Sequence, residues 1–444
     1  MASCTNGEEE LLLSNIKSEV ASPLCQEDDI SQSGLTVWTA ALILFACGFG
    51  VGIVTLPHAY QQLGPIIGSI VYCILALLCA IFAVLLSVSY LTVMQDDHSQ
   101  TKGDERAPYR DMMEAAFGKT GRYLLTIVLT FKLFASAVTL LLLSKSTVLG
   151  VFHKIDSSYP ILAPPWVVSL VLTIITGLGL LYRSPKSLKW ISSVATAAST
   201  ILSVLVIESL VYMKQNNNIT PRTWIKKETT AMDAFTAIGV MLFNLNFTFA
   251  LPTVQVDMVD PAKMKRGSFI TYLALGTTLA VPMLTAYYLI DGEIQPSLLD
   301  TLGRSRLYKG DVTFKVLVTI CQIALTIHCV AAVCPIINPL CQLVENIFNL
   351  PVNFTWHRVI SRFTIIFLAF LVEVFAPGFV HILSINGGLF VIQLTITFPA
   401  LIYERIQSDI AVWKKVMLWL TATIAVLLSL CIAVVGFLNI GEKS

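Results

Sequence analysis

Charged residues are scarce in this sequence. Lys, Arg, Asp and Glu make up 13% of its 444 residues, whereas they make up about 25% of an average soluble domain. Apolar residues make up 55%, and the mean hydropathy is +0.76. This composition excludes a soluble enzyme, a disordered scaffold and a nucleic-acid-binding protein, and the net charge of +1 creates no field that would attract an acidic partner. We expect an all-helical, polytopic membrane protein.

Motifs for catalysis and for metal binding are absent as well. The sequence contains no His-Glu-x-x-His, Gly-x-Gly-Asp or Gly-x-Ser-x-Gly pattern, so we expect no enzyme activity and no catalytic residue. Its ten cysteines lack the spacing of metal ligands, and eight of them lie in or beside apolar segments. We therefore expect no metal site and no bound cofactor, and we interpret these cysteines as small packing residues.

The first 34 residues are polar and acidic and cannot bury a core. Residues 1–34 have neither a basic n-region nor a cleavage pattern, so we expect a disordered cytoplasmic tail that is retained. Glu8 with Leu12 and Leu13 matches the acidic dileucine pattern that endosomal adaptor proteins bind. This pattern predicts adaptor partners and an endosomal or lysosomal membrane, with the plasma membrane as the alternative.

Eleven apolar stretches are long enough to cross a bilayer, which takes about 20 residues in a helix. Such long continuous runs indicate helices and not the short alternating strands of a membrane barrel. The transmembrane domain would cover residues 35–437, followed by a short C-terminal tail at 438–444. The expected segments lie near residues 36–60, 65–94, 122–152, 164–182, 188–213, 231–255, 268–290, 313–341, 357–375, 379–402 and 413–437.

The distribution of Lys and Arg predicts the orientation of the chain. With a cytoplasmic N-terminus, seventeen of these residues lie on the inner side and ten on the outer side, as the positive-inside rule requires. Arg358 and Arg362 are counted here among the inner loop residues. The sequon at Asn218 falls in the loop between the fifth and sixth segments, which this topology places outside, so we expect Asn218 to be glycosylated.

Three alternating glycines weaken the first segment. Gly48, Gly50 and Gly52 follow one another at every second position, and Pro57 removes a backbone hydrogen bond. One interpretation is close helix packing, because Gly48 and Gly52 fit a small-xxx-small motif. The other is an unwound segment that lets a substrate approach the backbone.

The sixth segment is interrupted at the matching place. Asn244 and Asn246 lie in the middle of an apolar helix and are followed by Pro252, and buried amides are costly there unless they face a polar cavity. The first and sixth segments open two sets of five, which have opposite orientations because five is odd. Interrupted helices at corresponding positions point to a transporter binding site, whose free N–H and C=O groups suit a zwitterion.

Several short stretches form recognisable signatures: Gly50 to Ala59 with Gly64, Leu251 to Pro261, Ala376-Pro377, Ile382 to Ser384 with Gly387-Gly388, and Phe398 to Leu401. In this order they resemble signatures of the amino acid/auxin permease family. The resemblance covers about residues 35–437 and implies the amino acid–polyamine–cation (LeuT-like) fold, in which ten helices form a five-plus-five inverted repeat and an eleventh follows. It also implies secondary transport of amino acids coupled to protons or sodium.

The resemblance also implies which residues contact the substrate and the coupling ion. In the sodium-coupled branch, a threonine at the position of Thr326 works together with an asparagine in the first helix. Here that position is Ala46, which has no side-chain oxygen for sodium. We therefore favour proton-coupled or facilitated transport, and sodium symport is an alternative. The implied substrate-binding residues are Gly48, Gly50, Val51, Gly52, Phe243, Asn244 and Asn246.

Two ionisable side chains lie at mid-membrane depth. Lys132 follows Arg122 by ten residues, which places it roughly 15 Å into the third segment, and His328 lies in the middle of the eighth. Each is a candidate coupling group that gains and loses a proton, or else a packed structural residue. Lys145 and Glu373 lie near the outer ends of their segments, where we expect Lys145 to snorkel and Glu373 to lie at the interface.

The sequence thus predicts a secondary transporter that moves amino acids across a lipid bilayer by alternating access. A second hypothesis is an amino acid sensor of the same fold that signals through its N-terminal tail. The two differ in whether amino acid uptake is measurable.

Overall fold

A computed structural model describes residues 34–96, 107–155, 164–181, 185–216, 229–350, 355–376 and 378–441. Secondary structure in these ranges is helical, apart from one isolated bridge between Leu35 and Met258. The earlier helices are α2 (Val37–Gly48), α3 (Gly52–Leu63), α4 (Pro65–Asp96), α5 (Pro108–Ile155), α6 (Pro165–Gly179), α7 (Pro185–Asn216), α8 (Ala231–Asn244), η1 (Thr248–Ala250), α9 (Leu251–Val256), η2 (Pro261–Lys263) and α10 (Met264–Leu289). The later ones are α11 (Leu298–Arg304), α12 (Arg306–Gly310), α13 (Val312–Ile347), α14 (Trp356–Phe375), α15 (Phe379–Ile385), η3 (Asn386–Val391), η4 (Gln393–Thr397), α16 (Phe398–Ile406) and α17 (Val412–Gly441).

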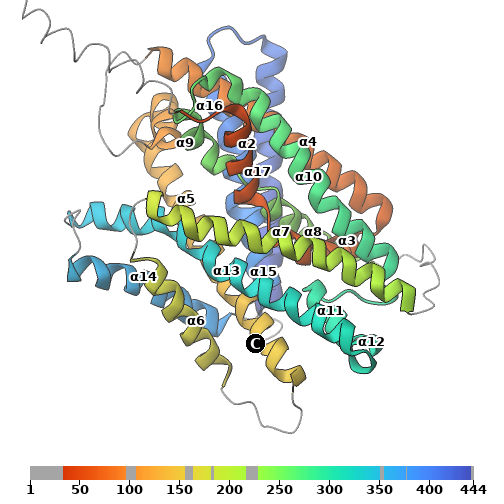
Figure 1. The fold of residues 1–444 in the computed structure, drawn as a ribbon. Helices are drawn as coiled ribbons and strands as arrows, with labels where there is room; N and C mark the ends of the chain where they lie inside the picture. The colour runs from red at the N-terminus through yellow and green to blue at the C-terminus, as the bar shows by residue number, and fades with distance from the viewer. Residues whose placement is uncertain are drawn as a thin grey trace, which may run out of the picture.

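The helices pack into one bundle, with the two short helices α11 and α12 at one end of α13 (Figure 1). In this bundle α7 and α13 run side by side, and α6 and α14 lie together at one edge. One part of the core forms around α3, which packs against both α8 and α10, and Leu56, Leu242 and Leu279 of these helices are fully buried. On the outside, large apolar side chains such as Ile74 and Leu427 are more than half exposed. Apolar surface on this scale suits contact with lipid.

Local sequence signals decide where the helices begin. Proline occupies the first position of α4, α5 and α6, where its missing N–H group costs nothing. Thr230 and Asp233 form a capping box at the start of α8, and the Asp311 carboxylate accepts a hydrogen bond from the Phe314 N–H at the start of α13. Gly118, with a φ of 64°, kinks α5, which is therefore a longer and more bent helix than the third expected segment.

Eight helices of the described ranges are long and apolar enough to cross a membrane, and the bent pair of α2 and α3 brings the number to nine. The two other expected segments correspond to α6, which has 15 residues, and to α14, which carries two arginines and a glutamate in 20 residues. The structure therefore shows a multi-pass membrane protein, and the count of eleven crossings stays a prediction.

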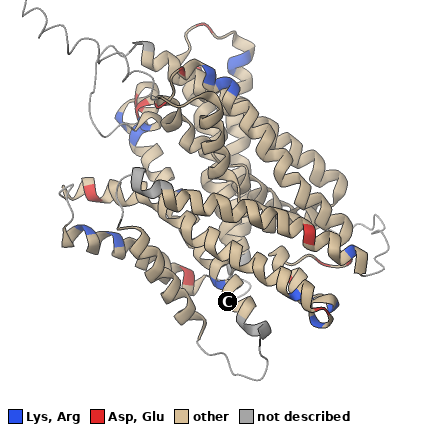
Figure 2. Cartoon of the chain, viewed as in Figure 1, with Lys and Arg blue, Asp and Glu red and all other residues tan. Residues whose placement is uncertain are grey.

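Charged side chains lie mainly near the ends of the long helices (Figure 2). Arg358 and Arg362 of α14 differ, because they are only 6% and 1% exposed. Their guanidinium Nε atoms lie 3.3 Å and 2.5 Å from a carboxylate oxygen of Glu345 on α13, and Arg362 also donates to the Leu180 carbonyl. The two arginines are therefore neutralised by an acid inside the bundle, and their place on the inner side stays a prediction.

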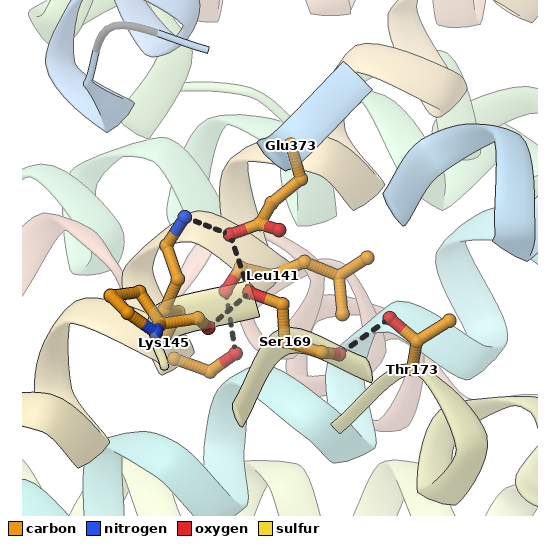
Figure 3. A network of polar contacts seen from close by, with 7 residues as sticks. Leu141, Lys145, Ser169, Thr173 and Glu373 are labelled. Atoms are coloured by element: carbon orange, nitrogen blue, oxygen red, sulfur yellow. Dashed lines mark hydrogen bonds and ion pairs between the residues drawn. The ribbon is translucent and has the colours of Figure 1, made fainter. Parts of the chain in front are cut away.

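A second ion pair lies inside the bundle, between α5 and α14. The Lys145 ammonium lies 2.5 Å from a carboxylate oxygen of Glu373, and that oxygen also accepts a hydrogen bond of 3.1 Å from the Ser169 hydroxyl of α6 (Figure 3). Glu373 is 0% exposed. The expectation that Lys145 snorkels and that Glu373 lies at the interface was therefore wrong, because each charge is neutralised by the other within the bundle.

Candidate functional site

The chain unwinds between α2 and α3, as the alternating glycines predict. The two helices meet at an angle of 62° at Phe49, Gly50 and Val51. Gly50 has a φ of 153°, and a Cβ atom built on it would overlap the imidazole ring of His328. The Ile53 and Val54 N–H groups donate to the Gly50 and Val51 carbonyls, whereas the Gly52 N–H at the start of α3 has no backbone acceptor among the described residues and is available to a ligand.

A second break follows α8. The helix ends at Asn244, and Leu245 to Phe247 are not helical before the short helix η1 begins. Pro252 then lies in the first turn of α9, where its missing N–H group is tolerated. Both interruptions that the sequence predicts are therefore present in the structure.

The two breaks are neighbours in space. The Asn244 side-chain amide donates to the Thr55 hydroxyl of α3 at 3.1 Å and to the Val240 carbonyl at 2.8 Å. A Cβ atom on Gly52 would lie 3.0 Å from the Asn244 Oδ1 atom, which leaves no room for a larger residue at that position. The Asn244 side chain thus ties the first break to the second.

The other predicted substrate residues line the same region. Asn246 is 5% exposed, and its Oδ1 atom has no hydrogen-bond partner. Gly48 lies beside it, since a Cβ atom on this glycine would be 3.8 Å from the Asn246 carbonyl oxygen. Val51 is buried, whereas Phe243 is partly buried with its backbone N–H close to Gly387 of η3. A buried amide oxygen without a partner suits a bound polar ligand or a water molecule.

His328 connects the first break to two long helices. Its side chain projects from α13, its Nδ1 atom lies 2.9 Å from the Ala195 carbonyl oxygen of α7, and its ring abuts Gly50. It is 5% exposed. Thr326, in contrast, donates to the Gln322 carbonyl of its own helix at 2.9 Å, so its hydroxyl group already has a partner. The structure brings His328, and not the Thr326 hydroxyl, against the unwound chain.

Lys132 lies on another side of the breaks. Its ammonium group is 3.4 Å from the centre of the Phe249 ring in η1, and the side chain is 2% exposed. Lys132 and the exposed Cys47, one turn before the first break, interact electrostatically. Lys132 and His328 therefore approach the same two breaks from different helices.

The far end of α3 is covered by residues 290–311, which include α11 and α12 and are called the cap below. The Gln61 side chain accepts a hydrogen bond of 2.6 Å from the Ile294 N–H and donates one of 2.7 Å to the Gly292 carbonyl. The His58 Nδ1 atom lies 2.6 Å from the Ile294 carbonyl oxygen. Three hydrogen bonds thus hold the cap on α3 at this end of the bundle.

The sequence agrees with the pattern of a known family over nearly its whole length. Residues 33–440 match the family described as transmembrane amino acid transporter protein. The chain belongs to this family of transporters. The search of proteins with curated functions found no match.

The fold of this transporter family member is shared with solved structures. Two mutants of a manganese transporter from Eremococcus coleocola align with TM-scores of 0.57 and 0.57 at 14% and 13% identity, covering 89% and 92% of this chain and 87% and 88% of theirs. MhsT in complex with L-phenylalanine aligns with a TM-score of 0.47 at 12% identity, over 89% of this chain and 98% of that chain. The likeness to the manganese transporter concerns the fold, and it confirms the expected inverted-repeat class.

The structure of this transporter also shows residues that the sequence did not single out. The Thr55 hydroxyl accepts a hydrogen bond from Asn244, and the Ala195 carbonyl contacts His328. The Phe249 ring lies against the Lys132 ammonium group. Thr55 lies within the first family signature, but the sequence does not indicate that its hydroxyl contacts Asn244. Ala195 contributes only a backbone carbonyl, and no sequence pattern reveals which carbonyl faces a distant side chain.

Some predicted sites lie outside the described residues. These are the glycosylation site at Asn218 and the adaptor motif of Glu8, Leu12 and Leu13. Within the described residues, no group of three or more His, Cys, Asp or Glu side chains could hold a metal ion, and eight cysteines are free.

Proposed function

We propose that this protein is a secondary active transporter that moves amino acids by alternating access and couples their movement to protons. The observation that carries the proposal is the contact between the two breaks, where Asn244 bridges to Thr55. The start of α3 offers the Gly52 N–H group at the positive end of a helix, which suits a carboxylate. The ends of α2 and α8 offer carbonyl groups, which suit an ammonium group. An amino acid carries both groups.

His328 is the coupling group that the geometry supports best. Its ring touches the unwound chain at Gly50, and its Nδ1 atom contacts the Ala195 carbonyl on α7. A proton gained or lost here changes the contact between the first break and the helices α7 and α13. Sodium coupling has less support, because Ala46 has no oxygen and the Thr326 hydroxyl is engaged within its own helix.

The test is uptake of labelled amino acids into proteoliposomes under an inward proton gradient or an inward sodium gradient. We expect accumulation with the proton gradient alone. His328→Gln should abolish the accumulation but retain exchange of amino acid across the membrane, because the breaks remain while the titrating group is lost. Accumulation driven by sodium would contradict the coupling proposal, and absence of any uptake would favour the sensor hypothesis.

We further propose a cytoplasmic N-terminus and an endosomal or lysosomal location. Support comes from the acidic dileucine pattern of Glu8, Leu12 and Leu13 and from the excess of Lys and Arg on the predicted inner side. Leu12→Ala with Leu13→Ala should move the protein to the plasma membrane in cell imaging. Asn218→Gln should remove a glycan and increase the mobility of the protein on a gel. An unchanged location, or unchanged mobility, would contradict the respective assignment.

A further inference from the structure

Lys132 differs from the other basic side chains inside the bundle. Lys145 pairs with Glu373, and Arg358 and Arg362 pair with Glu345. Among the described residues, no carboxylate oxygen lies within 4.0 Å of the Lys132 ammonium group. The buried acids Glu345 and Glu373 are thus committed to other cations.

A buried ammonium group needs compensation for the water that it loses. The face of the Phe249 ring, 3.4 Å away, attracts a cation but replaces only part of its hydration. An anion beside Lys132 would supply the rest. Lys132 is therefore a buried basic side chain that the acidic residues of the described ranges leave without a counter-ion.

Polar groups lie next to Lys132 on α5, since the Asn386 Nδ2 atom donates to the Lys132 backbone carbonyl at 3.4 Å. Asn386, at the start of the π-helical stretch η3, donates from Nδ2 to the Ser136 hydroxyl oxygen at 3.0 Å. Ser136 lies one turn beyond Lys132 on α5 and keeps its own hydroxyl hydrogen to donate. The Asn386 Oδ1 atom is buried without a partner, although the residue is 0% exposed. A π-helical stretch with an unsatisfied buried amide is typical of a functional position.

The neighbourhood of Lys132 adjoins the breaks, since Phe249 lies in η1 directly after the second one. Cys47 interacts electrostatically with Lys132, and its side chain is exposed. Cys47 precedes Gly50 by three residues, or about 4.5 Å along a helix. A substrate whose main-chain groups lie at the breaks could therefore extend its side chain toward α5 and Lys132.

We propose that Lys132, with the Ser136 hydroxyl, forms a subsite for the side-chain carboxylate of an acidic amino acid. The proposal rests on the proposed transport function and names its substrate class. The main-chain groups of the substrate bind at the breaks, and its side-chain carboxylate neutralises Lys132. Neutral amino acids leave that charge without a counter-ion and bind more weakly.

The test compares glutamate with glutamine, which match in length and shape and differ in charge. Competition against labelled substrate in proteoliposomes gives the affinity for each. We expect the native protein to bind glutamate at least about tenfold more tightly, as a charge-assisted contact would provide. Lys132→Met should bring the two affinities together, whereas Lys132→Arg should retain a preference for glutamate.

A second variant guards against misfolding of Lys132→Met. Ser136→Ala removes one donor at little cost in volume and should reduce the ratio of glutamate to glutamine affinity by several-fold. Replacing chloride with gluconate tests the other source of an anion. Chloride-dependent uptake of glutamine that Lys132→Met abolishes would overturn the carboxylate assignment.

The outcomes separate the two proposals. Equal affinities for glutamate and glutamine in the native protein, with uptake intact, would overturn the Lys132 subsite and leave the transport function standing. A glutamate preference that survives in Lys132→Met would do the same. Failure of every amino acid to accumulate or exchange would contradict the proposed function itself.

Discussion

Single residues at the breaks are constrained by what they touch. Gly50 has a positive φ and no space for a Cβ atom beside His328, whereas Gly310 has no neighbour within 4 Å of the Cβ position. The two glycines form a matched pair, one at the candidate site and one in the cap. Two ion pairs form a second matched set. Lys145 and Glu373 pair inside the bundle, whereas Lys263 and Asp260 pair at its surface.

We expect Gly50→Ala to reduce amino acid uptake by at least about tenfold, because the new methyl group forces the unwound chain and His328 apart. Gly310→Ala should leave uptake unchanged. The measurement is initial uptake into proteoliposomes, with size-exclusion chromatography to show that both variants fold. Normal uptake by Gly50→Ala would contradict the close contact between this glycine and His328.

We expect Glu373→Gln to destabilise the protein by about 3–5 kcal/mol, since it leaves the Lys145 charge without its acid inside the bundle. The double variant with Lys145→Met should regain part of this loss. As a control, Lys263→Met removes a pair whose side chains are 62% and 43% exposed and should cost at most about 1 kcal/mol. Melting temperature in detergent reports all three, and equal effects of the two single variants would argue against the buried pair.

At the scale of elements, the cap and the start of α13 decide how one end of the bundle is closed. The cap is held by the Gln61 and His58 side chains of α3. Its last residue, Asp311, is the N-cap of α13 and also accepts a hydrogen bond of 2.8 Å from the Tyr212 hydroxyl of α7. The cap therefore connects the broken first helix to the long helices behind it.

We expect Gln61→Ala to loosen the cap, because two hydrogen bonds to its backbone are lost. Amide hydrogen exchange of residues 290–297 should quicken by about tenfold for each 1.4 kcal/mol of lost stabilisation. Gln407→Ala, which loses a 2.7 Å side-chain bond to Thr92 elsewhere, should leave this segment unchanged. Unaltered exchange in Gln61→Ala would show that other contacts hold the cap.

Asp311 predicts a dependence of stability on pH. The Phe314 N–H and the Tyr212 hydroxyl donate to its carboxylate, and they lower the pKa of Asp311 below its ordinary value of 3.8. A lowered pKa means that the folded protein binds fewer protons, so this contribution is present above about pH 4 and is lost as the pH falls through the folded pKa. In Asp311→Asn, the melting temperature should fall less steeply with decreasing pH below about pH 4 than in the native protein. An equally steep fall in the variant would rule out this contribution.

At the scale of the whole molecule, the cap is bonded to α3 at one end of the bundle, and Cys47 lies in the last turn of α2, just before the first break. The alternating access that we propose requires a second arrangement in which the packing around this break differs. An amino acid that binds one arrangement more tightly than the other shifts the equilibrium toward the arrangement that it prefers.

We therefore expect added amino acid to change the rate at which a maleimide reagent modifies Cys47. Cys431 on α17 is also exposed and serves as the control, because it lies away from the breaks and should react at a constant rate. Mass spectrometry of the native protein follows each cysteine separately. A Cys47 rate that is independent of every amino acid tested would contradict a substrate-linked change at this break.

Much of the candidate site could be predicted from the sequence, because its features are local. Glycines at alternate positions and amides within an apolar helix weaken helical hydrogen bonding wherever the chain goes, so both breaks lie where Gly50 and Asn244 indicate. Apolar length likewise predicts the long helices. The positions predicted for Lys145 and Glu373 were wrong, because the two residues are more than 200 positions apart in the chain and hydropathy does not reveal which charges pair.

The sequence by itself determined that this is a helical membrane protein with two interrupted segments, since composition, helix length and backbone propensity act over a few neighbouring residues. Only the tertiary structure decided that Asn244 meets Thr55, that His328 rests on Gly50 and that Lys132 faces Phe249. Those contacts join helices distant in sequence, and their energies depend on distance and burial. The physical reason is that a charge or an amide acquires its role from the groups packed around it.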